Sequence, residues 1–324
     1  MRRRSALSLL AGVLLAPAAA RLARAQTGPR IVILHSGWPE RSPTRFLIQH
    51  LRALGYEDGR TAKIEILGAE GDPARLAALV SRIAAQPADL IFALTEPAAV
   101  ALKMAEITVP VVFLFVSDPV GRGLVASLAR PGANITGLTL SDGMLGGKRV
   151  ELLADAFPGL RHLAILWSAQ NFPNREVAAA ASRAATALGM RVSSHEFQGW
   201  DGLAPAFTAA QSSGAQAALF LTDNLLFGDR KRIAELAIAH HLPTMHFFPP
   251  EAEDGGLMSF GIDIQESYRR AADMAHKILH GTRPADLPVE EPTKFTLVVN
   301  LKTARGLGIE LPAAFVARAD EVIE

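Results

Sequence analysis

Cysteine is absent from the 324-residue sequence, and aromatic residues make up only 6% of it. Without cysteine the chain has no disulfides, no thiolate metal ligands, no cysteine nucleophile and no site for a lipid-bearing cysteine. An excess of charge of one sign is also lacking, because the formal net charge is only +1. This balance indicates neither a nucleic-acid partner nor a polyanion-binding surface, and it leaves small molecules as the expected partners.

Motifs that would identify an enzyme or a cofactor site are missing as well. No G-x-G-x-x-G, phosphate-loop or G-x-S-x-G sequence occurs, so nucleotide binding and α/β-hydrolase chemistry lack their local signatures. His276 and His280 have the i, i+4 spacing of metal ligands, but no carboxylate or cysteine pattern completes a site. We therefore expect no metal and no cofactor.

The N-terminus has the pattern of an export signal. A basic start is followed by a short apolar stretch and then by small residues, which predicts a cleavable signal peptide over residues 1–25. The alternative is a retained membrane anchor, but the apolar stretch is short of the roughly 20 residues needed, and Arg21 and Arg24 interrupt its end. We expect a periplasmic protein, exported by the Sec route or, given Arg3 and Arg4, by the twin-arginine route.

Beyond the signal peptide, short apolar runs alternate with segments of helical periodicity. This alternation predicts α/β lobes of parallel strands, joined by right-handed crossovers and covered by helices on both faces. The expected strands are residues 31–37, 62–69, 90–94, 111–116 and 134–140 in a first half, and 162–167, 191–197, 217–222, 243–248 and 256–262 in a second. Glycines at 143, 146 and 147 indicate a loose connection between the halves. We predict two Rossmann-like lobes, with one large sheet as the alternative.

Two further segments bear on how the lobes are divided. The apolar periodicity of GLVASLA, after the run that ends at Val116, predicts a helix between the fourth and fifth strands. Near the C-terminus, a helix over about 265–280 precedes a strand over 294–300 and a short helix. If that strand returns to the first sheet, the lobes are discontinuous and hinged. We therefore expect lobe 1 to contain residues 29–140 and 264–324, and lobe 2 to contain residues 141–263.

Polar residues follow several of the apolar runs at the point where each expected strand ends. They are Ser36-Gly37, Thr95, Ser117-Asp118 and, in the second half, Thr222-Asp223-Asn224. The carboxyl ends of parallel strands meet at one edge of a sheet, where helix N-termini present unpaired N–H groups to ligands. Helix capping is an alternative explanation for each segment. Capping and ligand binding are compatible. A capped helix end can still offer neighbouring N–H groups to a ligand carboxylate, and an adjacent aspartate can pair with the ligand ammonium group.

Two segments carry a resemblance to a known family. Residues 111–139, VVFLFVSDPVGRGLVASLARPGANITGLT, and residues 287–324 closely resemble a family of exported substrate-binding proteins of ABC transporters. Members are similar to type I periplasmic binding proteins, in which strands cross between two Rossmann-like lobes and a ligand lies in the hinged cleft. Some members bind aromatic or other amino acids. The resemblance implies that Ser36, Thr95, Ser117 and Asp118 line the cleft on the first lobe, Thr222, Asp223 and Asn224 on the second, and Asp263 near the crossover.

The function expected from these observations is non-catalytic. The chain would be the solute-binding component of an ABC importer, which captures a small polar ligand such as an amino acid and presents its closed form to a permease. We expect a monomer that meets the membrane only through the permease and does not bind nucleic acid. One alternative is a secreted hydrolase that uses Ser36 or Ser117 with a histidine, although no base spacing appears. The other is a ligand sensor for a membrane receptor.

Overall fold

The computed structural model describes residues 28–324 except for residues 87, 141, 170, 172 and 222–226. The expected signal peptide, residues 1–25, therefore lies outside the described residues. In the part of the chain that is described, no helix is both long enough and apolar enough to cross a membrane.

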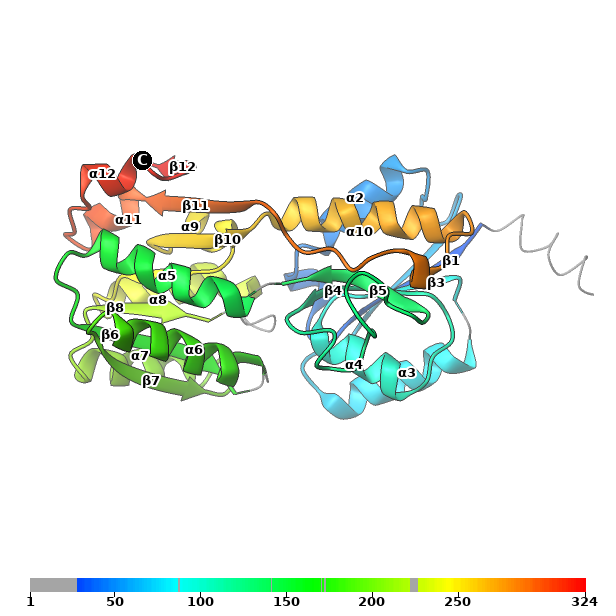
Figure 1. Ribbon diagram of the computed structural model, residues 1–324, viewed down its shortest axis with the longest axis horizontal. Coiled ribbons are helices and arrows are strands. Elements are labelled where there is room, and N and C mark those ends of the chain that lie inside the picture. The colour runs from blue at the N-terminus through cyan, green and yellow to red at the C-terminus, as the bar shows by residue number, and fades with distance from the viewer. Residues whose placement is uncertain (1–27, 87, 141, 170, 172, 222–226) are drawn as a thin grey trace, which may run out of the picture.

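A five-stranded parallel sheet in the order β2-β1-β3-β4-β5 forms the N-terminal half of the molecule (Figure 1). Its strands are β1 (Arg30–His35), β2 (Lys63–Gly68), β3 (Leu90–Ala93), β4 (Val111–Val116) and β5 (Ile135–Thr139). Helices α2 (Thr44–Ala53), α3 (Pro73–Ala85), α4 (Glu96–Met104) and α10 (Ile264–Leu279) cover the sheet. We call this sheet with its four helices lobe 1.

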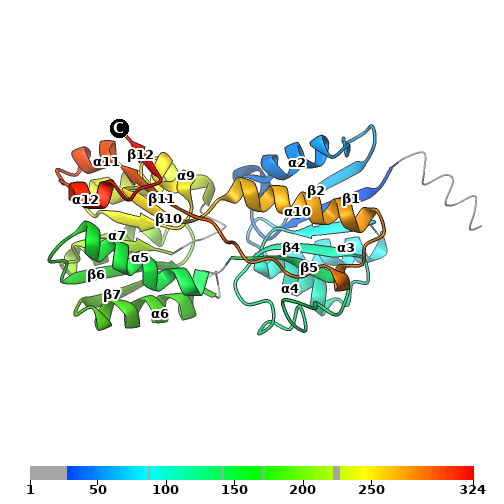
Figure 2. The same ribbon diagram turned by 45° about the horizontal axis from the view of Figure 1, so that its top comes forward.

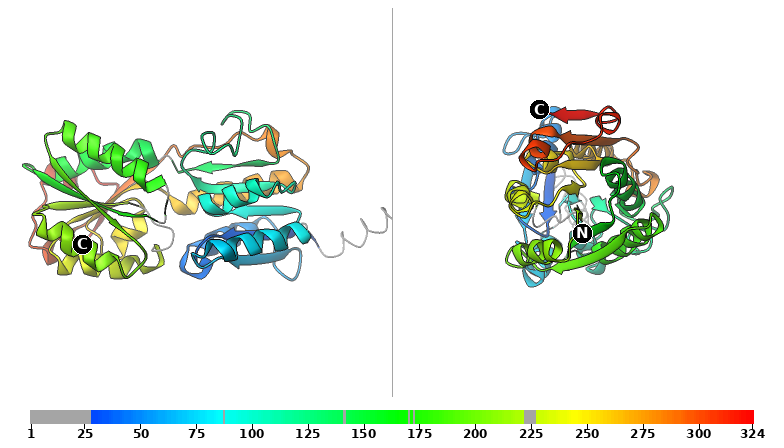
Figure 3. Two further views of the ribbon diagram at one scale, coloured as in Figure 1. Left: turned by 90° about the horizontal axis from the view of Figure 1, so that it is seen from below. Right: turned by 90° about the vertical axis from the view of Figure 1, so that its left-hand side faces the viewer.

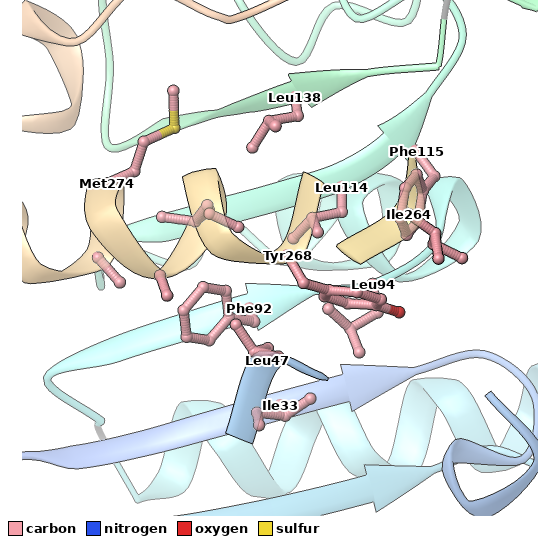
Figure 4. Close-up of a cluster of buried hydrophobic side chains, with 14 of the residues drawn as sticks. Ile33, Leu47, Phe92, Leu94, Leu114, Phe115, Leu138, Ile264, Tyr268 and Met274 are labelled. Carbon is pink, nitrogen blue, oxygen red and sulfur yellow. The ribbon is translucent and has the colours of Figure 1, made fainter. Parts of the chain in front are cut away.

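Both faces of the lobe 1 sheet are buried, because successive side chains along each strand point to opposite faces. In β1, Ile31 and Ile33 pack into the cluster that contains α2 and α10, whereas Val32 and Leu34 pack into the cluster that contains α3 and α4. Figure 4 shows the first of these clusters, with Tyr268 of α10 lying among strand side chains. The continuous apolar runs of the sequence are thus explained by burial on two sides.

A seven-stranded sheet in the order β12-β11-β10-β9-β8-β6-β7 forms the other half, which we call lobe 2 together with its helices. All neighbouring pairs are parallel except β10 and β11. The strands are β6 (His162–Ser168), β7 (Arg191–Phe197), β8 (Ala217–Phe220), β9 (Thr244–His246), β10 (Met258–Ile262), β11 (Phe295–Asn300) and β12 (Glu321–Ile323). The helices are α5 (Asp142–Ala156), α6 (Pro173–Ala187), α7 (Leu203–Ser212), α8 (Arg230–Ala239), α9 (Pro249–Glu253), α11 (Leu301–Gly306) and α12 (Ala313–Val316). The two sheets lie side by side as separate lobes (Figure 3).

The chain passes between the lobes at three points (Figure 2). It leaves lobe 1 after β5, returns from β10 into α10, and runs back to β11 after the 3₁₀ helix η3 (Pro284–Asp286). On the way, α10 packs against α2 and β4, and Glu290 forms a bridge with Leu138 of β5. Three connections restrict the relative movement of the lobes more than a single tether would.

The C-terminal strands belong to lobe 2 and not to lobe 1, where we expected residues 264–324. β11 runs antiparallel beside β10, and its side chains Leu297 and Val299 lie in the core of lobe 2. β12 pairs with β11 in the same sheet. The expectation is wrong for residues 295–324, because the apolar face of β11 is buried against lobe 2 helices.

The connection between β4 and β5 contains no helix, contrary to the prediction for GLVASLA. Residues 117–134 form turns and bends, and Gly123 takes a left-handed conformation with a φ of 67°, which does not continue a right-handed helix. Leu124 and Val125 are nevertheless buried in lobe 1. Their apolar periodicity therefore reflects burial of a turn and not a helix.

The glycines at 146 and 147 lie within helix α5 and not in a loose connection. A Cβ atom placed on Gly146 would lie 3.9 Å from the Ala181 Cβ, and one on Gly147 would lie 3.8 Å from the Ala184 Cβ, both on α6. The two glycines therefore face α6, at distances that would be ordinary contacts for a Cβ atom.

Candidate functional site

The carboxyl ends of β1, β3 and β4 form the edge of lobe 1 that faces lobe 2, because parallel β5 ends at the same edge and leads into lobe 2 (Figure 1). The Ser36 N–H, after β1, donates to the Thr95 Oγ1 at 3.3 Å. The Ser117 N–H, after β4, donates to the Glu96 Oε2 at 3.3 Å. The structure thus brings Ser36, Thr95, Glu96 and Ser117 into one hydrogen-bonded row, which we call the strand-end row.

Thr95 acts as a helix cap within the strand-end row. Its Oγ1 accepts the Ala98 N–H at 3.4 Å, and Pro97 follows in the first turn of α4, as is common at helix N-termini. The residue is fully buried. The Thr95 hydroxyl oxygen thus accepts two hydrogen bonds, one from the Ala98 N–H and one from the Ser36 N–H.

Glu96, which follows Thr95 after β3, belongs to the row although we did not predict it as a ligand-binding residue. Its side chain is only 9% exposed, and its Oε1 lies 2.8 Å from the Arg122 Nε. Burial raises the pKa of Glu96, and the Arg122 guanidinium and the Ser117 N–H offset part of that rise. The sequence signal for Glu96 is its position between a strand end and Pro97, which Thr95 shares.

His35 and Gly37 form a compact turn at the end of β1. The Gly37 N–H donates to the His35 Nδ1 at 2.8 Å, so this imidazole carries its proton on Nε2 when neutral. Burial lowers the pKa of His35 to about 4. At neutral pH the site therefore contains an uncharged histidine whose Nδ1 is already occupied.

Asp118 lies at the exposed end of the strand-end row. Its Oδ1 accepts the Gly121 N–H at 2.8 Å, and its carboxylate is so close that a Cβ on Gly121 would lie 2.0 Å from the Oδ2. The capping interpretation therefore holds for Asp118, although it caps a turn and not a helix. Its predicted contact with a ligand stays a prediction.

The residues predicted to line the cleft on lobe 2, Thr222, Asp223 and Asn224, lie outside the described residues. Among the described residues, Phe248 follows β9 and is 2% exposed. Its ring contacts that of Phe115 in lobe 1, with centroids 6.0 Å apart. An apolar contact between the lobes therefore lies beside the strand-end row.

Asp263 begins α10 at one of the three connections between the lobes. Its Oδ1 accepts the Gln265 N–H at 2.8 Å and the Glu266 N–H at 3.1 Å, which is helix capping. The structure thus places Asp263 at the crossover, and its predicted role in ligand binding stays a prediction.

The lobes also touch at two short 3₁₀ helices, η1 (Pro39–Arg41) and η2 (Phe227–Asp229). The Arg41 Nη1 lies 3.1 Å from the Asp229 Oδ2. Gly228 lies so close to η1 that a Cβ on it would be 2.4 Å from the Arg41 Cβ. A cavity of about 560 Å³ adjoins this contact, with Arg45 of lobe 1 and Glu253 of lobe 2 among its walls.

A family model for ABC transporter substrate binding proteins matches residues 43–323. The chain belongs to this family. The matched range includes most of both lobes and all three connections between them.

Individual relatives agree with this assignment. A tyrosine-binding protein of Clostridioides difficile is 25% identical over 271 residues, which cover 81% of this chain and 75% of that protein. A Streptococcus pneumonia structure in complex with L-Trp has a TM-score of 0.81 and 25% identity, covering 92% of this chain and 100% of the other. A ligand-free, open substrate-binding protein from Clostridium difficile has a TM-score of 0.64 and 24% identity, covering 91% and 99%. The two-lobe fold is that of periplasmic binding proteins.

Histidines of this ABC transporter substrate binding protein take part in local packing. Within the described part of the chain, no group of three or more His, Cys, Asp and Glu side chains could hold a metal ion. The His276 Nδ1 lies 3.1 Å from the Tyr56 hydroxyl, and the His280 Nδ1 donates to the His276 carbonyl oxygen at 2.8 Å. The spacing of His276 and His280 thus places both at the C-terminal end of helix α10, where each makes a hydrogen bond.

Proposed function

We propose that this chain is the periplasmic solute-binding component of an ABC importer. It captures an amino acid between its lobes and presents the closed form to a membrane permease, without catalysis and as a monomer. The observation that carries the proposal is the strand-end row of lobe 1, which faces lobe 2 across a junction spanned by three chain connections. The tyrosine-binding relative and the neighbour that holds L-Trp make aromatic amino acids the first candidates.

The hydrogen bonds of the strand-end row refine the chemistry that lobe 1 offers. The N–H groups of Ser36, Gly37 and Ser117 already donate to Thr95, His35 and Glu96. We therefore assign ligand contacts on this lobe to the half-buried hydroxyls of Ser36 and Ser117, and not to these N–H groups. A hydroxyl both donates and accepts, so it suits either end of a zwitterionic amino acid.

Closure would then complete the site. Each lobe contributes part of the surface, so a ligand bound between them favours the closed form by its contacts with both. Asp223 and Asn224 are the proposed partners on lobe 2, with the Asp223 carboxylate pairing with the ligand ammonium group. Removal of the ligand from water strengthens this charge pair.

Isothermal titration of the purified mature protein with L-Trp and L-Tyr tests the proposal, with L-Ala and glucose as comparison solutes. We expect saturable binding of at least one aromatic amino acid, and weaker or no binding of the comparison solutes. A protein that binds none of the twenty amino acids would contradict the proposal. Binding accompanied by turnover of the solute would instead support the hydrolase alternative.

Two substitutions of Asp118 separate a ligand contact from turn capping. Asp118→Asn keeps an oxygen that can accept the Gly121 N–H, whereas Asp118→Ala removes it. If the carboxylate contacts the ligand, both variants weaken binding, by about tenfold for a charge-assisted bond. If Asp118 only caps the turn, Asp118→Asn binds like the wild type and Asp118→Ala alone is weaker.

A further inference from the structure

Strand β4 contains a one-residue irregularity at Phe115. Leu114 pairs with Leu138 and Val116 with Thr139, so Phe115 has no pairing partner on β5. Its φ is 60°, in the left-handed region that residues other than Gly, Asn and Asp rarely adopt. An unpaired residue with this geometry is a β-bulge, a feature that often redirects a side chain next to a binding site.

The bulge changes the face of the sheet on which Phe115 lies. Along β4, Val111 and Phe113 pack with α3 and α4, and Val112 and Leu114 pack with α2 and α10. Strict alternation would place Phe115 beside Phe113. Phe115 lies instead in the cluster of Leu114, as Figure 4 shows.

On this face the Phe115 ring reaches the junction between the lobes. It packs edge to face on Tyr268 of α10, with centroids 5.6 Å apart, and on Phe248 of lobe 2, at 6.0 Å. Phe248 in turn packs edge to face on Phe227 of η2, at 5.4 Å. Phe115 is 6% exposed, so its contact with Phe248 excludes water between the lobes at this point.

We infer that Phe115 is a positioning residue for lobe closure: the bulge in β4 aims its ring at Phe248, so that closing the lobes over a ligand buries this aromatic pair. The inference rests on the proposed solute-binding function. It gives a role to the strained backbone of Phe115, which lies two residues before Ser117 of the strand-end row.

The main test compares Phe115→Leu with Phe113→Leu, a matched change two residues earlier on the opposite face of the same strand. Both keep an apolar side chain and remove one buried ring. We expect Phe115→Leu to weaken binding of L-Trp or L-Tyr by about threefold to tenfold, and Phe113→Leu to leave it within about twofold of the wild type. Equal weakening by both changes would overturn the inference.

A double substitution shows whether Phe115 acts through Phe248. If the pair is the relevant contact, adding Phe115→Leu to Phe248→Leu causes little further loss of affinity. Additive losses would mean that Phe115 acts in another way. The backbone strain at Phe115 is tested by comparing Phe115→Gly with Phe115→Ala. The glycine variant should have a melting temperature about 2 °C or more above that of the alanine variant, which reverses the usual order, because only glycine accepts this φ at little cost.

Small-angle scattering of the ligand-free protein keeps the inference testable if the proposed function fails. Should the wild type bind no amino acid, that function is contradicted, and lobe closure is then judged from the radius of gyration alone. We expect a larger radius for Phe115→Leu than for the wild type and Phe113→Leu. An unchanged radius together with unchanged affinity would overturn the role of Phe115.

Discussion

At the scale of single residues, His35 couples the stability of lobe 1 to pH. Its imidazole is 3% exposed at the end of β1, and its Nδ1 accepts the Gly37 N–H. Because protonation would place a charge in the core and break this hydrogen bond, the folded protein disfavours the charged form.

We expect His35 to make the protein less stable in mild acid. Its pKa is about 4 in the folded protein and 6.5 when unperturbed, so between these values the unfolded chain binds a proton that the folded protein does not. The free energy of unfolding therefore falls as the pH falls from 6.5 to 4, by about 3 kcal/mol from this group. Urea unfolding at pH 7, 6, 5 and 4 measures the decline.

The control for this prediction is a comparison of slopes, because carboxylates also titrate in this range. His35→Gln removes the titrating group, so its unfolding free energy should depend less on pH than that of the wild type. His280→Gln, on the exposed end of α10, is the matched change at a histidine outside the core. Parallel slopes for the wild type and His35→Gln would exclude His35 as the cause.

At the scale of elements, glycine has opposite roles in two places. Gly147 lies in helix α5, where an added Cβ would meet the Ala184 Cβ at 3.8 Å, an ordinary contact distance. Gly137 lies in β5, where an added Cβ would be 2.0 Å from the Phe113 carbonyl oxygen. The first glycine has room for a methyl group, and the second does not.

We therefore expect Gly147→Ala to stabilise the protein and Gly137→Ala to destabilise it. Alanine in place of a helical glycine raises the free energy of unfolding by about 0.5 to 1 kcal/mol. Gly137→Ala forces β4 and β5 apart and should lower it by about 3 kcal/mol or more. Chemical denaturation measures the change in the free energy of unfolding for both variants. A loss of stability in Gly147→Ala would mean that α5 and α6 leave no room for the added methyl group.

The elements that the sequence predicted well are those whose pattern has one physical cause. Apolar runs such as VVFLFV are strands in the structure, and they are apolar throughout because both faces of the sheet are buried. The periodicity of Leu124 and Val125 was misleading, since a buried turn needs apolar residues as much as a helix does. The bulge at Phe115 has no local signal, and the position of Glu96 after a strand does not reveal its ion pair with Arg122, because each depends on neighbours distant in sequence.

For the whole molecule, the connections and the contacts between the lobes have different roles. Three chain segments cross between the lobes, and the proposed closure would turn about them. Contacts between side chains of opposite lobes include those of Phe115 with Phe248 and of Arg41 with Asp229. Covalent connections persist in every state, so the balance between the proposed open and closed forms depends on such contacts and on the ligand.

Gly228 allows the contact between η1 and η2 to be tested with a single added methyl group. It is exposed, yet a Cβ on it would lie 2.4 Å from the Arg41 Cβ and 3.0 Å from the Arg41 carbonyl oxygen. Gly228→Ala should therefore push η1 and η2 apart. We expect a larger radius of gyration in solution and about tenfold weaker solute binding, with a melting temperature within about 3 °C of the wild type.

The matched control for Gly228→Ala is Asp229→Asn, which removes the charge of the ion pair but adds no bulk. An exposed pair such as Arg41 with Asp229 contributes about 1 kcal/mol at most and is screened by salt. Asp229→Asn should therefore have a smaller effect than Gly228→Ala, and the effect should disappear at high ionic strength, while that of Gly228→Ala persists. If both variants scatter like the wild type, η1 and η2 do not hold the lobes together, and closure depends on the aromatic contact and the ligand.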